Sequence, residues 1–138
     1  MRFLVDANVL SEPTRPAPNE QVVEWLRVNE RALVVDPIVL GEIRFGILLL
    51  PAGNKRRSLE IWFVGGVQKF ECVPWDATVG LEWARLLARL RATHLAMPIK
   101  DSMIAATALT HGFTIATRNE NDFRKAGVTV LNPFVKSR

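Results

Sequence analysis

The stretch FLVDANVL, residues 3–10, decides how this chain begins to fold. Its first three residues are apolar without alternation, which is typical of a strand buried on both faces of a sheet. The run ends abruptly at Asp6, and residues 8–12 then favour a short helix that Pro13 ends. A buried strand that leads directly into a helix indicates a parallel α/β sheet.

Short apolar runs and helical periods alternate along the rest of the chain, with no internal repeat and no linker. Asp36 followed by Pro37 predicts a helix N-cap with proline at the first helical position. The expected strands cover residues 3–5, 32–35, 71–73, 113–116 and 128–131, and the main expected helices cover residues 20–28, 37–50, 54–64, 76–91 and 100–111. This pattern predicts a single α/β domain over residues 1–138, built on a parallel sheet flanked by helices.

The composition is that of an ordinary folded domain. Of the 138 residues, 49% are hydrophobic and 23% are charged, which excludes disordered and low-complexity chains. The longest near-continuous apolar stretch, residues 38–50, is interrupted by charged residues and is too short to cross a bilayer. MRFLVDANVL lacks the features of a secretory signal, and a single cysteine, Cys72, forms no internal disulfide. We therefore expect a cytoplasmic protein.

The charge balance gives a weak indication of a polyanionic partner. Lysine and arginine number 18 against 14 acidic residues, so the formal net charge is +4. If several of the acids gather in one pocket, the remaining surface is more basic than this total suggests. Such a surface favours nucleic acid, although an ordinary basic surface has the same composition.

Two aspartates stand where the predicted elements meet at one edge of the sheet. Asp6 directly follows the first strand, and ligands of open α/β sheets bind beyond the carboxyl ends of the strands. Asp101 lies in the first turn of a predicted helix whose small residues allow close packing on the sheet. Each has an ordinary alternative, because Asp6 can cap a helix and Asp101 can interact favourably with the helix dipole.

Glu42 is harder to explain as a surface residue. It lies in IVLGEIRFGILLL, residues 38–50, which form a helix that is apolar on nearly every side. A carboxylate there needs a partner or stays protonated. Arg44 is a poor partner, because positions i and i+2 do not face each other on a helix. A buried cation, including a metal ion, is therefore a candidate partner.

Carboxylates that converge without histidine or thiol ligands suit a hard cation such as Mg²⁺ or Mn²⁺ and do not suit zinc. Neither His94 nor His111 lies among the acids, and Cys72, in its short strand, is interpreted as a core residue. The sequence contains no GxxxxGK[ST] loop, no GxGxxG after a strand, no GxSxG and no CxxC, so other common chemistries lack their motifs.

Four blocks in this order resemble the PIN-domain family and, within it, the VapC-type toxin ribonucleases of type II toxin–antitoxin systems. They are LVDANVL around Asp6, GEIRFGI around Glu42, KDSMIAATAL around Asp101 and IATRNENDF at residues 115–123. The resemblance implies a parallel sheet of strand order 3-2-1-4-5 and an endoribonuclease activity that depends on Mg²⁺, with Mn²⁺ as a substitute. It also implies a cognate antitoxin partner, an RNA substrate and a homodimer.

The same resemblance implies a set of site residues. The expected metal ligands are Asp6, Glu42 and Asp101. Thr117 matches a hydroxyl residue that the family uses to orient the site. Many members have a fourth aspartate where this chain has Asn119, so the fourth catalytic position falls to Asn119 or to Asp122. An amide brings no charge, and the number of metal ions, one or two, therefore stays open.

Two alternatives from other classes remain open. The first is a weakly catalytic or non-catalytic PIN module that works mainly by binding a DNA-binding antitoxin, which Asn119 favours and Glu42 opposes. The second is a Mg²⁺-dependent phosphoacceptor or phosphatase, but the sequence lacks the paired acids and late lysine that it needs. For a nuclease, the cations expected to contact the RNA backbone are Arg44, Lys55, Arg56, Arg57, Arg85, Arg89 and Arg118.

Overall fold

A computed structural model describes residues 1–136 and contains a five-stranded parallel sheet of order β3-β2-β1-β4-β5. The strands are β1 (Phe3–Val5), β2 (Leu33–Val35), β3 (Glu71–Cys72), β4 (Thr114–Ala116) and β5 (Val130–Leu131). The central strand β1 pairs with β2 on one side, where Phe3 lies opposite Leu33, and with β4 on the other, where Leu4 lies opposite Ile115. The predicted fold class and strand order are confirmed.

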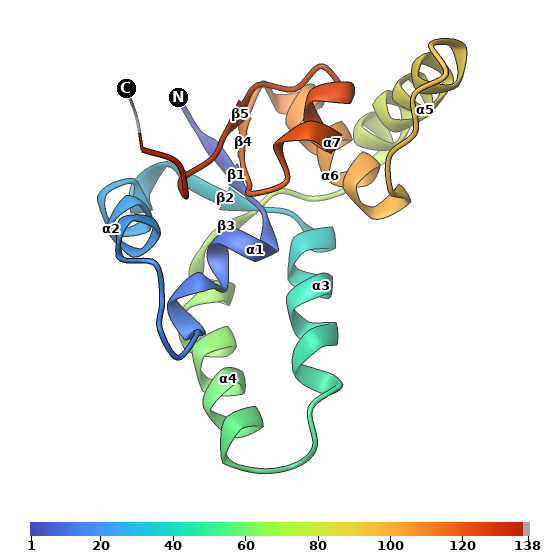
Figure 1. Cartoon of the computed structure of the whole chain (residues 1–138). Coiled ribbons are helices and arrows are strands. Elements are labelled where there is room, and N and C mark those ends of the chain that lie inside the picture. The colour runs from blue at the N-terminus through green and yellow to red at the C-terminus, as the bar shows by residue number, and fades with distance from the viewer. Residues whose placement is uncertain (137–138) are drawn as a thin grey trace.

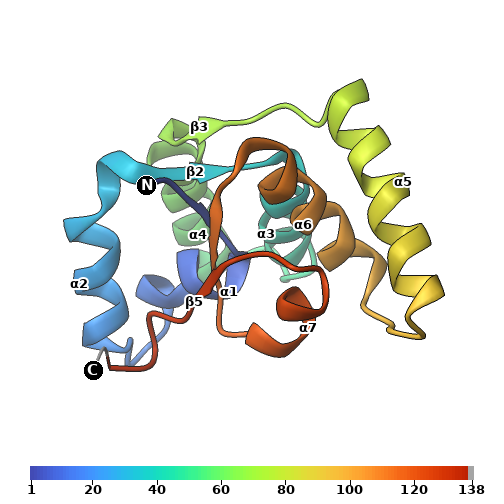
Figure 2. The ribbon, with the colours of Figure 1, turned by 90° about the horizontal axis from the view of Figure 1, so that it is seen from above.

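Helices surround this sheet and extend beyond it (Figures 1 and 2). They are α1 (Ala7–Leu10), α2 (Glu20–Val28), α3 (Pro37–Leu48), α4 (Asn54–Gly65), α5 (Ala77–Ala92), α6 (Ile99–His111) and α7 (Glu120–Lys125), with 3-10 turns at η1 (Glu12–Thr14), η2 (Glu30–Ala32) and η3 (Val67–Lys69). Figure 1 shows α2 on one side, α5, α6 and α7 on the opposite side, and α3 beside α4 as a pair that points away from the sheet. Within residues 1–136, no helix is both long and apolar enough to cross a membrane.

The helix boundaries follow from local capping chemistry. Asp36 caps α3, because its Oδ1 accepts a hydrogen bond from the backbone N–H of Val39 at 2.9 Å, and Pro37 occupies the first helical position. Gly112 ends α6 in the left-handed region, at φ 72°, which a residue with a side chain rarely adopts. The N-cap at Asp36 and the position of Pro37 agree with the sequence prediction.

One prediction about the core is wrong. Cys72 is exposed rather than buried, and so is its neighbour Glu71. The reason is topological: β3 is a two-residue strand at the edge of the sheet, whereas β1 at the centre is buried at all three positions. A short apolar run does not distinguish a central strand from an edge strand.

The helix α7, which follows the loop after β4, packs against the hydrophobic core through one residue. Phe123 is the buried residue of this helix, and its side chain is fully buried in the main core. We expect Phe123→Ala to lower the free energy of unfolding by about 3–5 kcal/mol, because it removes apolar contacts and leaves a cavity. Urea denaturation followed by circular dichroism measures this loss.

The control is Val28→Ala on α2, where the side chain is 64% exposed. Its effect should stay within about 0.5 kcal/mol, as for most surface substitutions. A loss for Phe123→Ala as small as that of the control would contradict the packing of α7 described above.

Candidate active site

Asp6 lies at the centre of the candidate site, directly after the central strand β1. Its backbone is extended, and its Oδ1 caps α1 by accepting a hydrogen bond from the N–H of Ala7 at 2.8 Å. Its Oδ2 accepts a hydrogen bond from the hydroxyl of Thr117 at 2.7 Å and another from the side-chain amide of Asn8 at 3.3 Å. The residue is 4% exposed. Asp6 is therefore a helix cap and a site residue at once.

Thr117 holds the loop after β4 against the loop after β1. Its buried hydroxyl donates to Asp6 and accepts a hydrogen bond from the backbone N–H of Asn119 at 2.9 Å. Asn8 adds a second connection, because its Oδ1 accepts from the backbone N–H of Arg118 at 3.1 Å. Since β1 and β4 are parallel neighbours, the two loops leave the sheet at the same edge. The orienting role predicted for Thr117 has a matching geometry.

Asn119 connects two further carboxylates. Its side-chain Nδ2 donates to Oδ2 of Asp101 at 3.1 Å and to Oδ2 of Asp122 at 3.0 Å. The second oxygen of Asp122 accepts from the ammonium of Lys125 at 3.2 Å. Asn119 therefore presents an amide donor, rather than its carbonyl oxygen, to the acids in this arrangement.

Glu42 reaches the site from α3 and faces a lysine. The ammonium Nζ of Lys100 lies 3.0 Å from Oε2 of Glu42, whose side chain is 29% exposed. This contact is an ion pair, and Lys100 is the charged partner of this buried oxygen. Arg44 pairs instead with Glu60 on α4, at 3.7 Å, as the poor i, i+2 geometry predicted.

Burial and mutual repulsion raise the pKa values of Asp6 and Asp101. Burial raises the pKa of Asp6, and the negative charge of Glu42 raises it further, while the hydrogen bond from Thr117 opposes the rise. Burial together with the charge of Asp6 raises the pKa of Asp101 to about 6, and the positive charge of Lys100 limits that rise. The acids on β1, α3 and α6 thus influence one another electrostatically.

The donor chemistry of this cluster suits a hard divalent cation, because every candidate ligand atom is a carboxylate oxygen. Within residues 1–136, however, no three histidine, cysteine or acidic side chains are arranged to hold one ion. In this arrangement the Lys100 ammonium lies against Glu42, and the Asn119 amide bridges Asp101 and Asp122. The cation that Glu42 faces in this arrangement is Lys100.

The sequence prediction identified the members of this network but missed Lys100. The predicted site residues Asp6, Glu42, Asp101, Thr117, Asn119 and Asp122 all take part in it, through hydrogen bonds or through charge. Lys100 occupies the first turn of α6, next to Asp101, where a cation interacts unfavourably with the helix dipole. That unfavourable position is the one local signal that could have indicated a special role.

Comparison with known proteins identifies the family of this chain. A sequence profile described as the PIN domain matches residues 3–128. The plasmid stability protein StbB of Pseudomonas syringae pv. tomato is 39% identical, over 96% of this chain and 98% of the relative. The VapC ribonuclease Y4jK of Sinorhizobium fredii is 31% identical, over 96% of this chain and 97% of the relative.

Toxin FitB of Neisseria gonorrhoeae is 34% identical, over 96% of this chain and 98% of the relative. The structure of FitAB bound to an IR36 DNA fragment superposes with a TM-score of 0.92 at 33% identity, covering 99% of this chain and 98% of that chain. The fold and the acidic edge of the sheet define a PIN domain, and the chain belongs to the PIN-domain family. Within that family it is of the VapC and FitB type.

The raised pKa of Asp101 predicts a pH-dependent stability. A raised pKa in the folded state favours folding at low pH, and this contribution is lost as the pH rises through about 6. In chelator at neutral pH, Asp101→Asn should therefore have a higher Tm than the wild type, because it removes one repelling charge. The difference should disappear as the pH falls below the ordinary value of 3.8. Thermal melts across this pH range measure it.

Asp122→Asn is a matched control with the opposite sign. Hydrogen bonds from Asn119 and Lys125 lower the pKa of Asp122, so its charge favours folding at neutral pH and its loss should lower Tm slightly. If Asp101→Asn instead melts below the wild type at every pH, Asp101 acts only through the helix dipole, and the electrostatic coupling of the site is wrong.

Proposed function

We propose that this PIN domain is a Mg²⁺-dependent endoribonuclease that acts in the cytoplasm as the toxin of a toxin–antitoxin pair. One observation carries the proposal: Asp6, Glu42 and Asp101 gather at the carboxyl edge of the sheet, where the pKa values of Asp6 and Asp101 are raised. Perturbed carboxylates in such a position are typical of functional sites. The names of the relatives, a VapC ribonuclease and a toxin, support this choice of reaction and role.

In this proposal Asp6, Glu42 and Asp101 would hold the cation, with Mn²⁺ as a substitute for Mg²⁺. When bound, such an ion lowers the pKa of its water and neutralises charge on the phosphate. Binding by all three acids requires Glu42 to leave the ammonium of Lys100, which lies 3.0 Å away.

The chain's own residues orient the reacting groups. The Thr117 hydroxyl fixes Oδ2 of Asp6, and the Asn119 amide fixes Oδ2 of Asp101, so both carboxylates face the site in defined directions. A carboxylate oxygen that does not contact the cation accepts a hydrogen bond from the attacking water and orients it. Asp122, held by Asn119 and Lys125, is the fourth acid available for this task.

Several of the cations expected to contact the RNA backbone already have partners within the chain. Arg85 pairs with Glu82, Arg89 donates to the carbonyl of Ala126, and Arg118 lies over the ring of Phe134. Arg44 and Arg56 both pair with Glu60, and their charges are thereby partly compensated. Lys55 and Arg57, at the beginning of α4, are exposed and form no ion pair among residues 1–136. We propose these two as phosphate contacts, which makes RNA binding sensitive to salt and insensitive to sequence.

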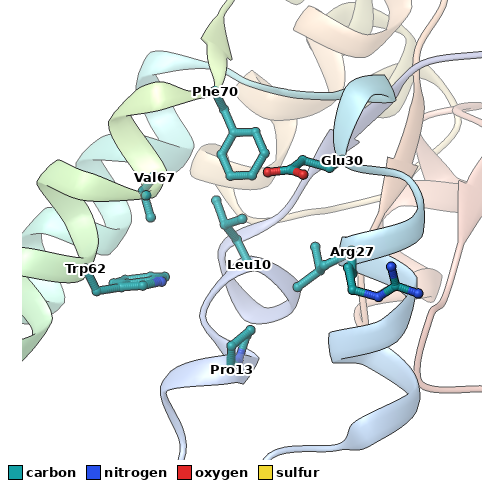
Figure 3. A pocket seen from close by; sticks show the side chains of 9 residues that line it. Leu10, Pro13, Arg27, Glu30, Trp62, Val67 and Phe70 are labelled. Atoms are coloured by element: carbon teal, nitrogen blue, oxygen red, sulfur yellow. The ribbon is translucent and has the colours of Figure 1, made fainter.

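A pocket between α1, α2 and α4 is our proposed docking site for a segment of the antitoxin. It has a volume of 270 Å³, and Leu10, Trp62 and Phe70 line its apolar part. Figure 3 shows Glu30 beside Phe70 at the rim of the pocket, while the guanidinium of Arg27 points away from the apolar side chains, toward Glu24, with which it pairs. An apolar floor with a carboxylate at its rim suits an amphipathic peptide.

Exposed apolar residues on α3 and α4 support the predicted homodimer. Phe45 on α3 is 62% exposed, Leu49 at the C-cap of α3 is 68% exposed, and Ile61 on α4 is 73% exposed. A concentration of large apolar side chains on one paired arm is typical of a protein interface. We propose that two copies of the chain associate through this arm.

Light scattering tests the dimer. The purified wild-type chain at high micromolar concentration should have the mass of a dimer, and Leu49→Arg should have the mass of a monomer, because it places a charge in the apolar interface. Val28→Arg, at a residue 64% exposed on α2, is the control and should remain dimeric. A wild-type chain that is monomeric at this concentration contradicts the proposal.

The alternative of a non-catalytic binding module keeps one supporting observation. In the arrangement described, Asn119 replaces a fourth acid and the Lys100 ammonium compensates Glu42, so part of the negative charge of the site is balanced by the chain itself. A module of this kind would bind the antitoxin through the α1–α2–α4 pocket and would leave RNA intact in Mg²⁺ or Mn²⁺.

Site-directed variants separate the two functions. Asp6→Asn, Glu42→Gln and Asp101→Asn should each reduce Mg²⁺-dependent RNA cleavage by orders of magnitude, because the loss of a charged ligand weakens the metal site. Cleavage of a mixed RNA pool by antitoxin-free protein, with Mg²⁺ or with chelator, measures the rate. Glu24→Gln is the control, since this exposed acid pairs only with Arg27 on α2.

Two results would overturn the nuclease. The first is cleavage by Asp101→Asn at the wild-type rate. The second is a folded wild-type chain that binds its antitoxin and leaves RNA intact in both metals, which is the behaviour of the binding module.

A further inference from the structure

A buried hydrogen bond connects α3 and α6, the two helices that carry Glu42 and Asp101. The hydroxyl of Thr107, on α6, donates to Oδ2 of Asp36, the N-cap of α3, at 2.8 Å. Both residues are completely buried. The candidate site itself does not contain this bond, and no site residue touches either partner in the hydrogen bonds described above.

The two oxygens of Asp36 serve different elements. Oδ1 accepts from the backbone N–H of Val39 and fixes the first turn of α3, while Oδ2 accepts from Thr107 and attaches α3 to α6. One carboxylate therefore determines both where α3 begins and where α6 lies beside it. A shift of either helix would leave a buried carboxylate oxygen without its donor, which is energetically costly.

The hydrogen bond of Thr107 differs from that of its neighbour on the same helix. A threonine inside a helix commonly donates to the carbonyl one turn earlier, and Thr110 does this, to the carbonyl of Ala106 at 2.8 Å. Thr107 instead donates to another helix. Thr107 therefore links two helices, whereas Thr110 serves only its own helix.

The position of the bond relates it to the site. Glu42 follows Asp36 by six residues along α3, and Asp101 precedes Thr107 by six residues along α6. Each acid therefore lies about 9 Å along its helix from the residue that forms the Asp36–Thr107 hydrogen bond. The Glu42–Lys100 ion pair forms the second polar contact between these helices, at the site end. If that pair opens, the Asp36–Thr107 bond is the polar contact that still holds α3 against α6.

We propose that Thr107, acting through Asp36, is a positioning residue that sets α3 against α6 and thereby fixes the spacing of Glu42 and Asp101 for a shared divalent cation. This inference rests on the proposed function, because it assigns the acids to one cation. Thr107 touches neither the cation nor the RNA. Its effect is on the geometry of two ligands that belong to different helices.

Three threonine variants test the inference. Thr107→Val keeps the shape of the side chain and removes the hydroxyl, Thr107→Ser keeps the hydroxyl, and Thr110→Val removes a hydroxyl that serves only its own helix. The measurement is the Kd for Mn²⁺ by isothermal titration, at a temperature where each variant is fully folded. The Mg²⁺ dependence of RNA cleavage is the second measurement.

We expect Thr107→Val to weaken Mn²⁺ binding by about 10- to 100-fold, the usual range for residues that orient metal ligands. Excess Mg²⁺ should restore much of its RNA cleavage. Thr107→Ser and Thr110→Val should bind Mn²⁺ like the wild type.

Asp36→Ser is a second variant, in case Thr107→Val does not fold. Serine still caps α3 but is too short to reach Thr107, so the Kd for Mn²⁺ should rise in the same way.

The inference is wrong if Thr107→Val melts at a lower temperature but binds Mn²⁺ with the wild-type Kd, because the role of Thr107 is then only structural. Equal losses in Thr107→Val and Thr110→Val overturn it as well. A wild-type chain that neither binds Mn²⁺ nor cleaves RNA refutes the proposed function itself. A wild-type chain that does both, with no change in Thr107→Val, refutes the positioning role alone.

Discussion

The hydrogen bond from Thr117 to Asp6 is the interaction on which the candidate site depends. Neighbouring parallel strands end at the same edge, so β1 and β4 bring these two residues together although they are far apart in the sequence. Burial raises the pKa of Asp6, and the Thr117 donor is the largest contribution that favours its charged form. The charge of Asp6 in turn raises the pKa of Asp101, so the electrostatics of the site begin at this contact.

Most of the fold could be predicted from local sequence, because strand ends, caps and breakers are local signals. The bounds of α2 agree with the prediction, and Asp36 caps α3 as expected. Strand order came from the family resemblance, since periodicity does not specify which strands are neighbours. The exposure of Cys72 could not be predicted for the same reason: it follows from the edge position of β3. Lys100 was missed because its contact with Glu42 joins two helices that only the tertiary fold brings together.

Lys100 changes the energetic balance of the site. One ammonium lies beside Glu42 and acts on Asp6 and Asp101 as well, so a single positive charge opposes the repulsion of three carboxylates. The compensation is incomplete, since the pKa of Asp101 is still about 6. Such unfavourable charges lower the stability of the fold but are available to bind a cation, and functional sites commonly reduce stability in this way.

The distribution of charge also affects how a phosphodiester reaches the site. The acids at the carboxyl edge of the sheet repel an anion, whereas the cations at the beginning of α4 attract it, and the chain carries an excess of four positive charges. In the proposed function, the surface would therefore retain RNA while the acidic edge rejects its phosphates until a divalent cation is present. Because binding free energies are linked reciprocally, RNA at this edge would also increase the affinity for the cation. Cation and substrate are thus expected to bind cooperatively, because each reduces a repulsion that opposes the other.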